Sequence, residues 1–203
     1  MRRPVVADGF QHFHMNDVAE PVRYKLFMGA IVPRPIALVT TLGPDDVVNA
    51  APFSSFMSLS AVNNLVAISI NERGPEGVKD TMRNIVARRE FVINTVSEAL
   101  AVQAQTCADD FPPHVSEVSV AGLSLVASQT IATPRIAESP IHFECTLHSI
   151  LPFETAQLIV GRVVVMHARE GLIEGARVSL DGYAPLGRLA GRAYCKVGDI
   201  INV

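Results

Sequence analysis

The sequence has little charge, and none of its positive charge is concentrated. Only 18% of its 203 residues are charged, and the 17 basic and 20 acidic side chains give a formal net charge of −3. No polybasic run is present, so the electrostatic pattern of a nucleic-acid-binding protein is missing. No apolar stretch reaches the roughly 18–20 residues that a membrane-spanning helix needs. We therefore expect neither nucleic acid nor a membrane among its partners.

Cysteine is also scarce. Cys107, Cys145 and Cys195 are odd in number and far apart, which is typical of neither a disulfide framework nor a zinc site. The first residues are basic but lack the apolar segment of a secretory signal. These two absences favour the reducing cytosol, and we expect a cytoplasmic protein.

Several sequence motifs are absent as well. No G-x-G-x-x-G follows a predicted strand, and no G-x-x-x-x-G-K-[ST] loop occurs, which argues against a Rossmann or P-loop nucleotide site. No G-x-S-x-G nucleophile elbow occurs. The chemistry must therefore come from other residues.

Hydrophobic residues make up 49% of the sequence, which argues against disorder. We expect an irregular arm over residues 1–22 and a single domain over residues 23–203. Short β-branched runs predict several strands, whereas helical spacing appears only twice. This pattern favours a mainly β fold with helices (α+β), a barrel or a sandwich with helical covers. The predicted strands are 36–41, 47–52, 65–70, 91–96, 141–148 and 158–166, the predicted helices are 80–89 and 98–108 with Ser97 as N-cap, and the predicted loops are 74–77 and 109–120.

The segment 141–148 alternates apolar and polar side chains, so we expect a half-buried antiparallel strand with His142 and His148 on its polar face.

The first candidate site is the segment 49–56, which joins small residues, a proline and two serines at the end of a predicted strand. Small side chains let a flat ligand approach the backbone, whose free N–H and C=O groups can read the edge of a heterocycle. The alternative, which these residues by themselves favour, is a β-turn followed by two core phenylalanines. The residues concerned are Asn49, Ala50, Ala51, Pro52, Ser54 and Ser55.

The second candidate is the start of the helix predicted at 80–89. Lys79, Asp80 and Thr81 lie where the free N–H groups and the helix dipole favour an anion. A lysine ammonium and a threonine hydroxyl suit a phosphate. The alternative, again favoured by spacing alone, is an ordinary capped helix with a solvated lysine.

A third candidate combines Arg34 with the strand residues Thr40 and Thr41. Neighbouring prolines hold Arg34 in an extended segment, and the alternative is a surface arginine. The two threonines point to opposite faces of a strand, so at most one can face a given ligand.

Taken together, these segments resemble the flavin reductase-like, FMN-binding split-barrel family. The resemblance covers about residues 24–195 and rests on blocks that occur in the family's order. These blocks are Gly29-Ala30-Ile31-Val32-Pro33-Arg34-Pro35-Ile36-Ala37-Leu38-Val39-Thr40-Thr41, Asn49-Ala50-Ala51-Pro52-Phe53-Ser54-Ser55-Phe56, Lys79-Asp80-Thr81-Met82-Arg83-Asn84-Ile85, Glu90-Phe91-Val92-Ile93-Asn94, Ala121-Gly122-Leu123, Ala137-Glu138-Ser139-Pro140, Glu144-Cys145 and Leu186-Gly187-Arg188-Leu189.

The resemblance implies a homodimer with FMN near the subunit interface. It implies that Lys79 and Thr81 hold the flavin phosphate with help from the Thr40/Thr41 strand, and that the backbone of residues 49–55 meets the ring edge. Asn84 either supports the phosphate loop or simply packs. Many relatives carry a Pro-Pro pair where this chain has Asn63-Asn64, so we expect this loop, and with it the rim of the pocket, to differ in shape.

The resemblance also implies an NAD(P)H-dependent flavin reductase, in which hydride passes from nicotinamide to the flavin N5. Electrons then go to free flavin, a partner oxygenase or another acceptor. FAD stays open as a cofactor, as does the choice between NADH and NADPH. Two alternatives are a flavin-binding carrier or redox sensor without turnover, and a split-barrel protein with haem or no cofactor, in which His142, His148 or His167 is a ligand.

Overall fold

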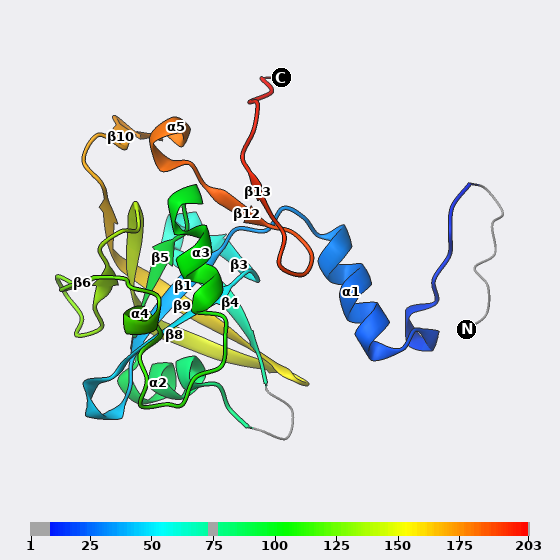
Figure 1. The fold of residues 1–203 in the computed structure, drawn as a ribbon, viewed down its shortest axis with the longest axis horizontal. Coiled ribbons are helices and arrows are strands. Elements are labelled where there is room, and N and C mark those ends of the chain that lie inside the picture. Colours follow the sequence, from blue (N-terminus) through cyan, green and yellow to red (C-terminus); the bar gives the residue numbers. More distant parts are fainter. Residues whose placement is uncertain (1–8, 73–76, 203) are drawn as a thin grey trace.

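The computed structural model describes residues 9–72 and 77–202. Within them, the main element is a seven-stranded antiparallel sheet with the strand order β2-β1-β5-β8-β9-β4-β3 (Figure 1). The expected mainly β fold with helices is therefore confirmed. The seven strands are β1 (Ala37–Leu42), β2 (Val48–Phe53), β3 (Phe56–Ser60), β4 (Leu65–Asn71), β5 (Glu90–Thr95), β8 (Ile141–Phe153) and β9 (Ala156–Ala168).

The sheet curls on itself. Strands β2 and β3 lie at opposite edges of the sheet, yet only two residues separate Phe53 from Phe56 in the chain. The two edges therefore come together, and the backbone N–H of Ser69 donates to the carbonyl of Ser55 at 2.9 Å at this corner. Apolar side chains fill the interior, among them Val39, Phe53, Ile68, Ile85, Phe91, Ile93, Cys145 and Ile159.

Strand β1 is buried on both faces. Alternation directs Val39 and Thr41 into the barrel, and Leu38 and Thr40 to its outer side. A second core covers that outer side, formed with the helices α3 (Ala101–Thr106) and α4 (Glu117–Val120).

Helix α2 (Asp80–Arg88) contributes Ile85 to the interior core. Figure 1 shows it at one end of the barrel, below α4. The remaining elements are short: β6 (Leu125–Val126), β7 (Arg135–Ile136), β10 (Ile173–Glu174), β11 (Arg177–Val178), α5 (Leu180–Tyr183), β12 (Leu186–Arg188), β13 (Tyr194–Lys196), and the 3-10 helices Met15–Asp17, Pro44–Asp46, Ala61–Asn63 and Glu98–Leu100.

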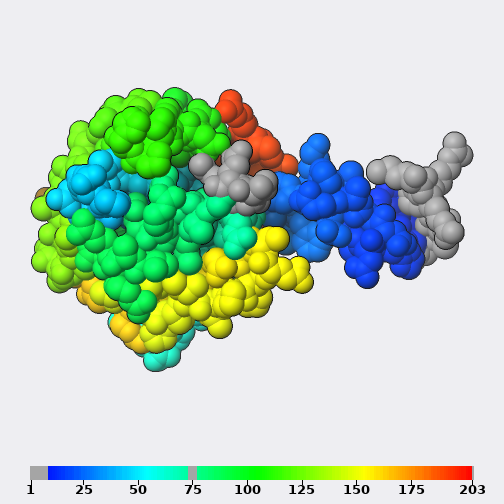
Figure 2. All heavy atoms as spheres, turned by 90° about the horizontal axis from the view of Figure 1, so that it is seen from below, coloured from blue at the N-terminus to red at the C-terminus, as the bar shows by residue number. Residues whose placement is uncertain are grey.

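Helix α1 (Glu20–Ala30) was not predicted from the sequence. It crosses the expected boundary between an irregular arm and the domain, because Pro21 in its first turn is compatible with a helix start. None of its residues is buried, and it extends away from the barrel in both views (Figures 1 and 2). Its C-terminal end, next to the barrel, is anchored by Arg34, whose guanidinium Nη1 donates to the carbonyls of Met28 and Ile31 at 2.6 Å each.

Three further predictions need correction. The helix expected at 98–108 is a 3-10 turn followed by the shorter α3, and Ser97 makes no capping hydrogen bond with its side chain. The loop expected at 109–120 contains α4. The strand β8 is longer than expected and its first half is buried on both faces, since His142 is as inaccessible as its apolar neighbours.

Residues 74–76 of the predicted loop 74–77 lie outside the described residues. In the described part of the chain, no helix is long and apolar enough to cross a membrane.

Candidate functional site

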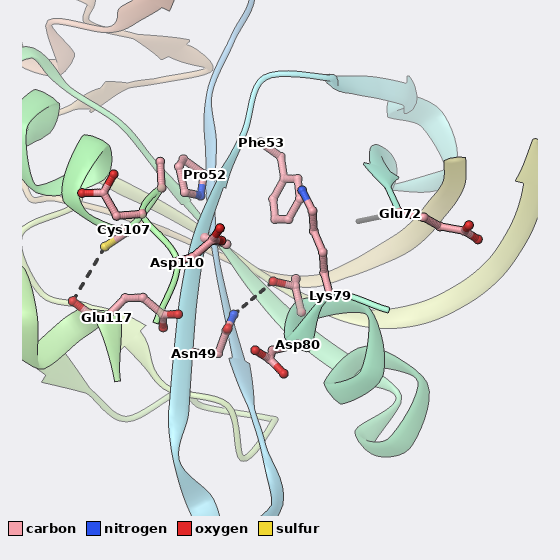
Figure 3. Close-up of a pocket in the computed structure, with 13 residues that line it drawn as sticks. Asn49, Pro52, Phe53, Glu72, Lys79, Asp80, Cys107, Asp110 and Glu117 are labelled. Atoms are coloured by element: carbon pink, nitrogen blue, oxygen red, sulfur yellow. Dashed lines mark hydrogen bonds between the residues drawn. The ribbon is translucent and has the colours of Figure 1, made fainter. Parts of the chain in front are cut away.

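A cavity of about 340 Å³ lies between the edge strand β2, the start of α2 and the segment that joins α3 to α4 (Figure 3). This volume falls within the range of small-molecule sites. The residues that line it are Asn49, Ala51, Pro52, Phe53, Glu72, Lys79, Asp80, Thr81, Cys107, Ala108, Asp109, Asp110 and Glu117.

The start of α2 forms the electropositive end of this cavity. Lys79 is the N-cap residue, and its side chain has no acceptor to cap the N–H groups of the first turn. Its Nζ lies 5.8 Å from the centre of the Phe53 ring. Beside it, Asn49 Nδ2 donates to the hydroxyl of Thr81 at 3.0 Å. A cation, a hydroxyl, an amide and a helix N-terminus thus meet at one place, which suits a phosphate.

Asp80 carries a charge of the opposite sign at this end. Its carboxylate forms an ion pair with Arg83 at 2.6 Å within the first turn of α2. This pairing offsets the repulsion that the carboxylate exerts on an anion beside Lys79.

The opposite wall contains Glu117 and Cys107. Glu117 is only 8% exposed, and its Oε2 accepts the backbone N–H of Ala50 at 2.9 Å. Burial, and then the nearby charge of Glu117, raise the pKa of the Cys107 thiol to about 12. Cys107 is therefore a neutral thiol at physiological pH, and it is not an activated nucleophile.

The structure brings together the two candidate segments that the sequence identified. Their residues that line the cavity are Asn49, Ala51, Pro52, Lys79, Asp80 and Thr81.

Arg34 and Ser54 do not line this cavity. The Nε of Arg34 donates to the Ser54 hydroxyl at 3.3 Å, and Nη2 donates to the carbonyl of Leu189 at 2.8 Å. All parts of the guanidinium therefore contact groups of the protein itself, and Arg34 joins α1 to the barrel. Ser55, the neighbour of Ser54, is exposed at the corner between β2 and β3.

Thr40, Thr41 and Asn84 are also absent from the lining. Thr40 donates to the carbonyl of Pro134 at 2.7 Å on the outer side of β1, whereas Thr41 accepts from Asn84 Nδ2 at 3.1 Å on the inner side. The two threonines thus face opposite sides, as expected, and both are fully buried. Ala50 is fully buried as well, and it meets the cavity wall only through the bond from its N–H to Glu117.

Sequence reasoning missed the part of the lining that comes from α4 and from the segment that joins α3 to it. The residues concerned are Cys107, Ala108, Asp109, Asp110 and Glu117, together with Glu72 and Phe53. A Pro-Pro pair and mixed polarity led to the prediction of a loop over residues 109–120. No local sequence signal indicates that this segment contacts β2.

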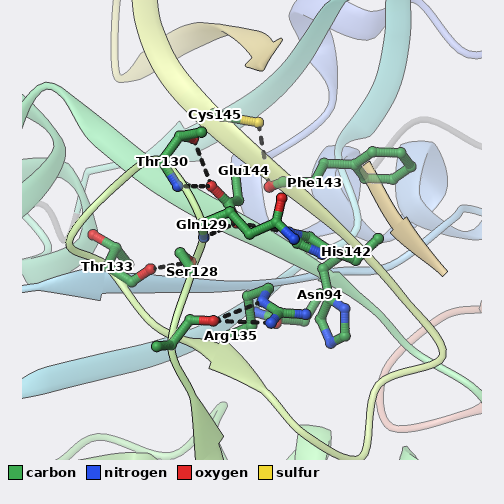
Figure 4. A network of polar contacts seen from close by, with 12 residues as sticks. Asn94, Ser128, Gln129, Thr130, Thr133, Arg135, His142, Phe143, Glu144 and Cys145 are labelled. Atoms are coloured by element: carbon green, nitrogen blue, oxygen red, sulfur yellow. Dashed lines mark hydrogen bonds and ion pairs between the residues drawn. The ribbon is translucent and has the colours of Figure 1, made fainter. Parts of the chain in front are cut away.

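The histidines considered as ligands contact groups of the protein itself, and Figure 4 shows one of them, His142, in the polar network that contains Glu144. His167 Nε2 lies 2.6 Å from Glu144 Oε1, and His142 Nε2 lies 2.7 Å from the carbonyl of Ile136. Burial lowers the pKa of His142. His148 is exposed, with Nδ1 3.5 Å from a guanidinium nitrogen of Arg162.

Glu144 is fully buried beneath the loop that joins β6 to β7. It accepts the N–H of Gln129 at 2.6 Å, and both the N–H and the hydroxyl of Thr130 at 2.9 and 2.6 Å. Burial alone would raise its pKa, but these bonds and the one to His167 outweigh burial and lower the pKa to about 2. Glu144 is therefore an ionised structural residue at physiological pH.

A curled antiparallel sheet with a cavity beside its edge strand defines the class of this protein, and comparison with known proteins gives its family. Residues 28–189 match the model of the flavin reductase like domain, so the chain belongs to that family. A split-barrel protein from Shewanella frigidimarina shares the fold, with a TM-score of 0.83 at 17% identity. The predicted family and the split-barrel fold are therefore confirmed.

Two solved structures are more similar in sequence. Nitrilotriacetate monooxygenase component B from Bacillus cereus is 33% identical, with 97% and 100% of the two chains covered and a TM-score of 0.93. The 2-nitrobenzoate 2-nitroreductase NbaA from Pseudomonas fluorescens is 37% identical, with 95% of each chain covered and a TM-score of 0.87. An uncharacterised protein from Aquifex aeolicus is 36% identical over 174 residues, 85% of this chain and 89% of its own.

The cavity fits the flavin that this family implies. The uncapped N-terminus of α2, with Lys79 and Thr81, suits a phosphate, and the small side chain of Ala51 and the flat ring of Pro52 leave room for a planar ring along β2. The chain is accordingly a member of the flavin reductase-like family, and its structural neighbours include oxidoreductases.

Proposed function

We propose that this protein binds FMN in the cavity beside β2 and acts as an NAD(P)H-dependent flavin reductase. The observation that carries the proposal is the meeting of Lys79, Thr81 and Asn49 at the start of α2, in a chain of the flavin reductase-like family. One cation and one helix N-terminus suit the single phosphate of FMN better than the diphosphate of FAD.

Each part of the cavity has a distinct role in this proposal. Lys79 and Thr81 hold the phosphate, Asn49 orients the Thr81 hydroxyl, and Ala51 and Pro52 support the ring. The bound flavin supplies hydride acceptance and onward electron transfer, so the protein needs to provide only binding and orientation. The remaining predicted residues lie outside the lining of this cavity, and we propose no contact between them and the flavin: Arg34, Thr40, Thr41, Ala50, Ser54, Ser55 and Asn84.

A homodimer would explain why helix α1 exposes apolar side chains. Tyr24 and Phe27 on this helix, and Ile31 directly after it, are each about half exposed. The helix buries none of its own residues, and a second copy of the chain would cover these apolar side chains. We propose such a dimer in the cytoplasm. Similarity to a protein named component B of nitrilotriacetate monooxygenase supports an oxygenase as the electron acceptor.

A double substitution tests the phosphate site. Lys79→Ala together with Thr81→Ala removes the two side chains that contact the phosphate, so FMN affinity should fall by about 100-fold, or about 3 kcal/mol. Flavin fluorescence titration measures the affinity. Lys196→Ala, which removes an exposed lysine that pairs with Glu98 and does not line the cavity, is the matched control. Unchanged FMN affinity in the double variant would show that the phosphate lies elsewhere.

The reaction is tested by an anaerobic visible spectrum of the FMN-loaded protein before and after NADH or NADPH is added. Bleaching of the flavin band much faster than in free FMN supports a reductase. Bound flavin that neither nucleotide bleaches would contradict the reductase and favour a flavin carrier or redox sensor.

A further inference from the structure

Arg83 lies outside the cavity, yet its guanidinium contacts both neighbours of Lys79. Its Nη1 donates to the carboxylate of Asp80 at 2.6 Å, and its Nη2 donates to the carbonyl of Val78 at 3.1 Å. Asp80 lines the cavity, whereas Arg83 is not among the lining residues. One side chain of α2 therefore holds the main chain before Lys79 and the carboxylate directly after it.

Acidic side chains are numerous around this cavity. Among the described residues that line it, Lys79 is basic, and the acidic ones are Glu72, Asp80, Asp109, Asp110 and Glu117. An anionic ligand therefore depends on how these carboxylates are paired and where they point. Asp80 matters most at the phosphate end, because it directly follows Lys79, and Figure 3 shows the two side chains leaving the same end of α2 in different directions.

The Asp80 carboxylate is a potential competitor of a phosphate. Aspartate side chains readily accept hydrogen bonds from neighbouring main-chain N–H groups, and negative charge is stabilised near a helix N-terminus. The side chain of the N-cap residue makes no hydrogen bond to this turn. A carboxylate that turned inward would therefore meet the same N–H groups that suit a phosphate. In the structure, the carboxylate is bonded to Arg83 instead.

We propose that Arg83 is a positioning residue for the flavin phosphate: it holds the Asp80 carboxylate away from the start of α2 and leaves the N–H groups there to the phosphate. This inference rests on the proposed function, because it assumes that the phosphate binds at this end of the cavity. The side chain of Arg83 is 54% exposed, so the ion pair adds little to stability. Its effect is on which anion occupies the start of the helix.

Arg88, on the same helix, provides a matched control. Its Nη2 donates to the carboxylate of Asp46 at 2.9 Å and to the carbonyl of Gly43 at 3.0 Å. Arg88 thus has the same charge and the same two kinds of partner as Arg83, but it lies at the opposite end of α2 and does not line the cavity. An effect that comes only from weakening α2 should appear in variants of both arginines.

The experiment compares Arg83→Ala with Arg88→Ala by flavin fluorescence titration. FMN affinity should fall about fivefold in Arg83→Ala, because the released carboxylate competes with the phosphate, and by less than about twofold in Arg88→Ala. Riboflavin lacks the phosphate, so its affinity should change by less than about twofold in either variant. Unchanged FMN affinity in Arg83→Ala, or an equal loss in the two variants, would overturn the inference.

Asp80→Ala separates an action through Asp80 from a direct attraction between Arg83 and the phosphate. This substitution removes the competing carboxylate, so FMN affinity should stay the same or rise. When Arg83→Ala is added to Asp80→Ala, no carboxylate is released, and the further loss of FMN affinity should stay below about twofold. A further loss of about fivefold would show that Arg83 attracts the phosphate directly and would overturn the assignment.

The wild-type protein distinguishes failure of this inference from failure of the proposed function. It should bind FMN at least about tenfold more tightly than riboflavin, because only FMN carries the phosphate. Equal affinity for the two flavins, or binding of neither, would refute the proposed phosphate site and the inference together. A preference for FMN that Arg83→Ala leaves unchanged would refute the inference alone.

Discussion

Glu117 and Glu144 are both buried carboxylates, but their surroundings differ. Glu144 is enclosed by Gln129, Thr130 and His167, which together place four donors on its two oxygens. Four contacts match the acceptor capacity of a carboxylate, so nothing is left for a ligand. Glu117 bonds the N–H of Ala50 and lines a cavity.

The difference between these two regions shows how burial relates to function. A carboxylate whose hydrogen bonds are all made inside the protein fixes the chain, here the loop between β6 and β7, to the sheet. A carboxylate that lines a cavity, as Glu117 does, contributes to the shape and charge of that cavity. Substitution of Glu144 should therefore change stability, and substitution of residues around the cavity should change binding.

The largest expected effect belongs to Glu144→Ala. The substitution leaves the N–H groups of Gln129 and Thr130 without their acceptor, and it should reduce the free energy of unfolding by at least about 3 kcal/mol. Urea denaturation measures this loss. The folded fraction should bind FMN normally, and Glu144→Gln, which keeps an acceptor oxygen, should cost less. A loss below about 1 kcal/mol for Glu144→Ala would contradict the structural role.

Acid should also lower the free energy of unfolding, because it protonates Glu144. The pKa of Glu144 is about 2 in the folded protein against an ordinary value of 4.5, so its ionised form stabilises the fold above the ordinary value. This contribution, about 3 kcal/mol at about 1.36 kcal/mol per pH unit, is lost as the pH falls from about 5 toward 2. Urea denaturation across this range should show a steeper loss in the wild-type protein than in Glu144→Gln. If the free energy of unfolding fell with pH in the same way in both proteins, the stabilising role of ionised Glu144 would be refuted.

The smallest expected effects are those of substituting two threonines, Thr41 in the core and Thr81 at the cavity. Thr41→Val removes the acceptor for Asn84 in the core, and we expect a loss of about 1 kcal/mol in stability with unchanged FMN affinity. Thr81→Val, at the cavity, should instead reduce FMN affinity by about tenfold. Urea denaturation and flavin titration of both variants test the comparison. If the Thr41 variant lost affinity to the same degree, the strand β1 would contact the phosphate after all.

Much of the sheet was predictable because its signal is local. Runs rich in β-branched residues placed strands at β1, β2, β4, β5, β8 and β9 to within a few residues, apart from the far end of β8. Helix α1 was missed because Pro21 and Gly29 look like helix breakers, and because a helix with no buried face shows no apolar stripe. The burial of His142 was missed since the loop between β6 and β7 covers the polar face of its strand.

The candidate site was predictable in part for the same reason. The preference of a helix N-terminus for an anion is a property of Lys79 and its immediate neighbours, and small residues on a strand mark a close approach. Glu117 gives no such local signal. Its relevance depends on the N–H of Ala50, 67 residues earlier in the chain.

The sequence by itself determined the strands, the electropositive start of α2 and the family, because each depends on residues close together in the chain or on their order along it. Only the tertiary structure decided which side chains share the cavity. It made β2 an edge strand, attached Ser116 and Glu117 to that edge, and enclosed Thr40, Thr41 and Glu144. The physical reason is that a buried polar group must find partners wherever the fold places them, and these partners come from distant segments of the chain.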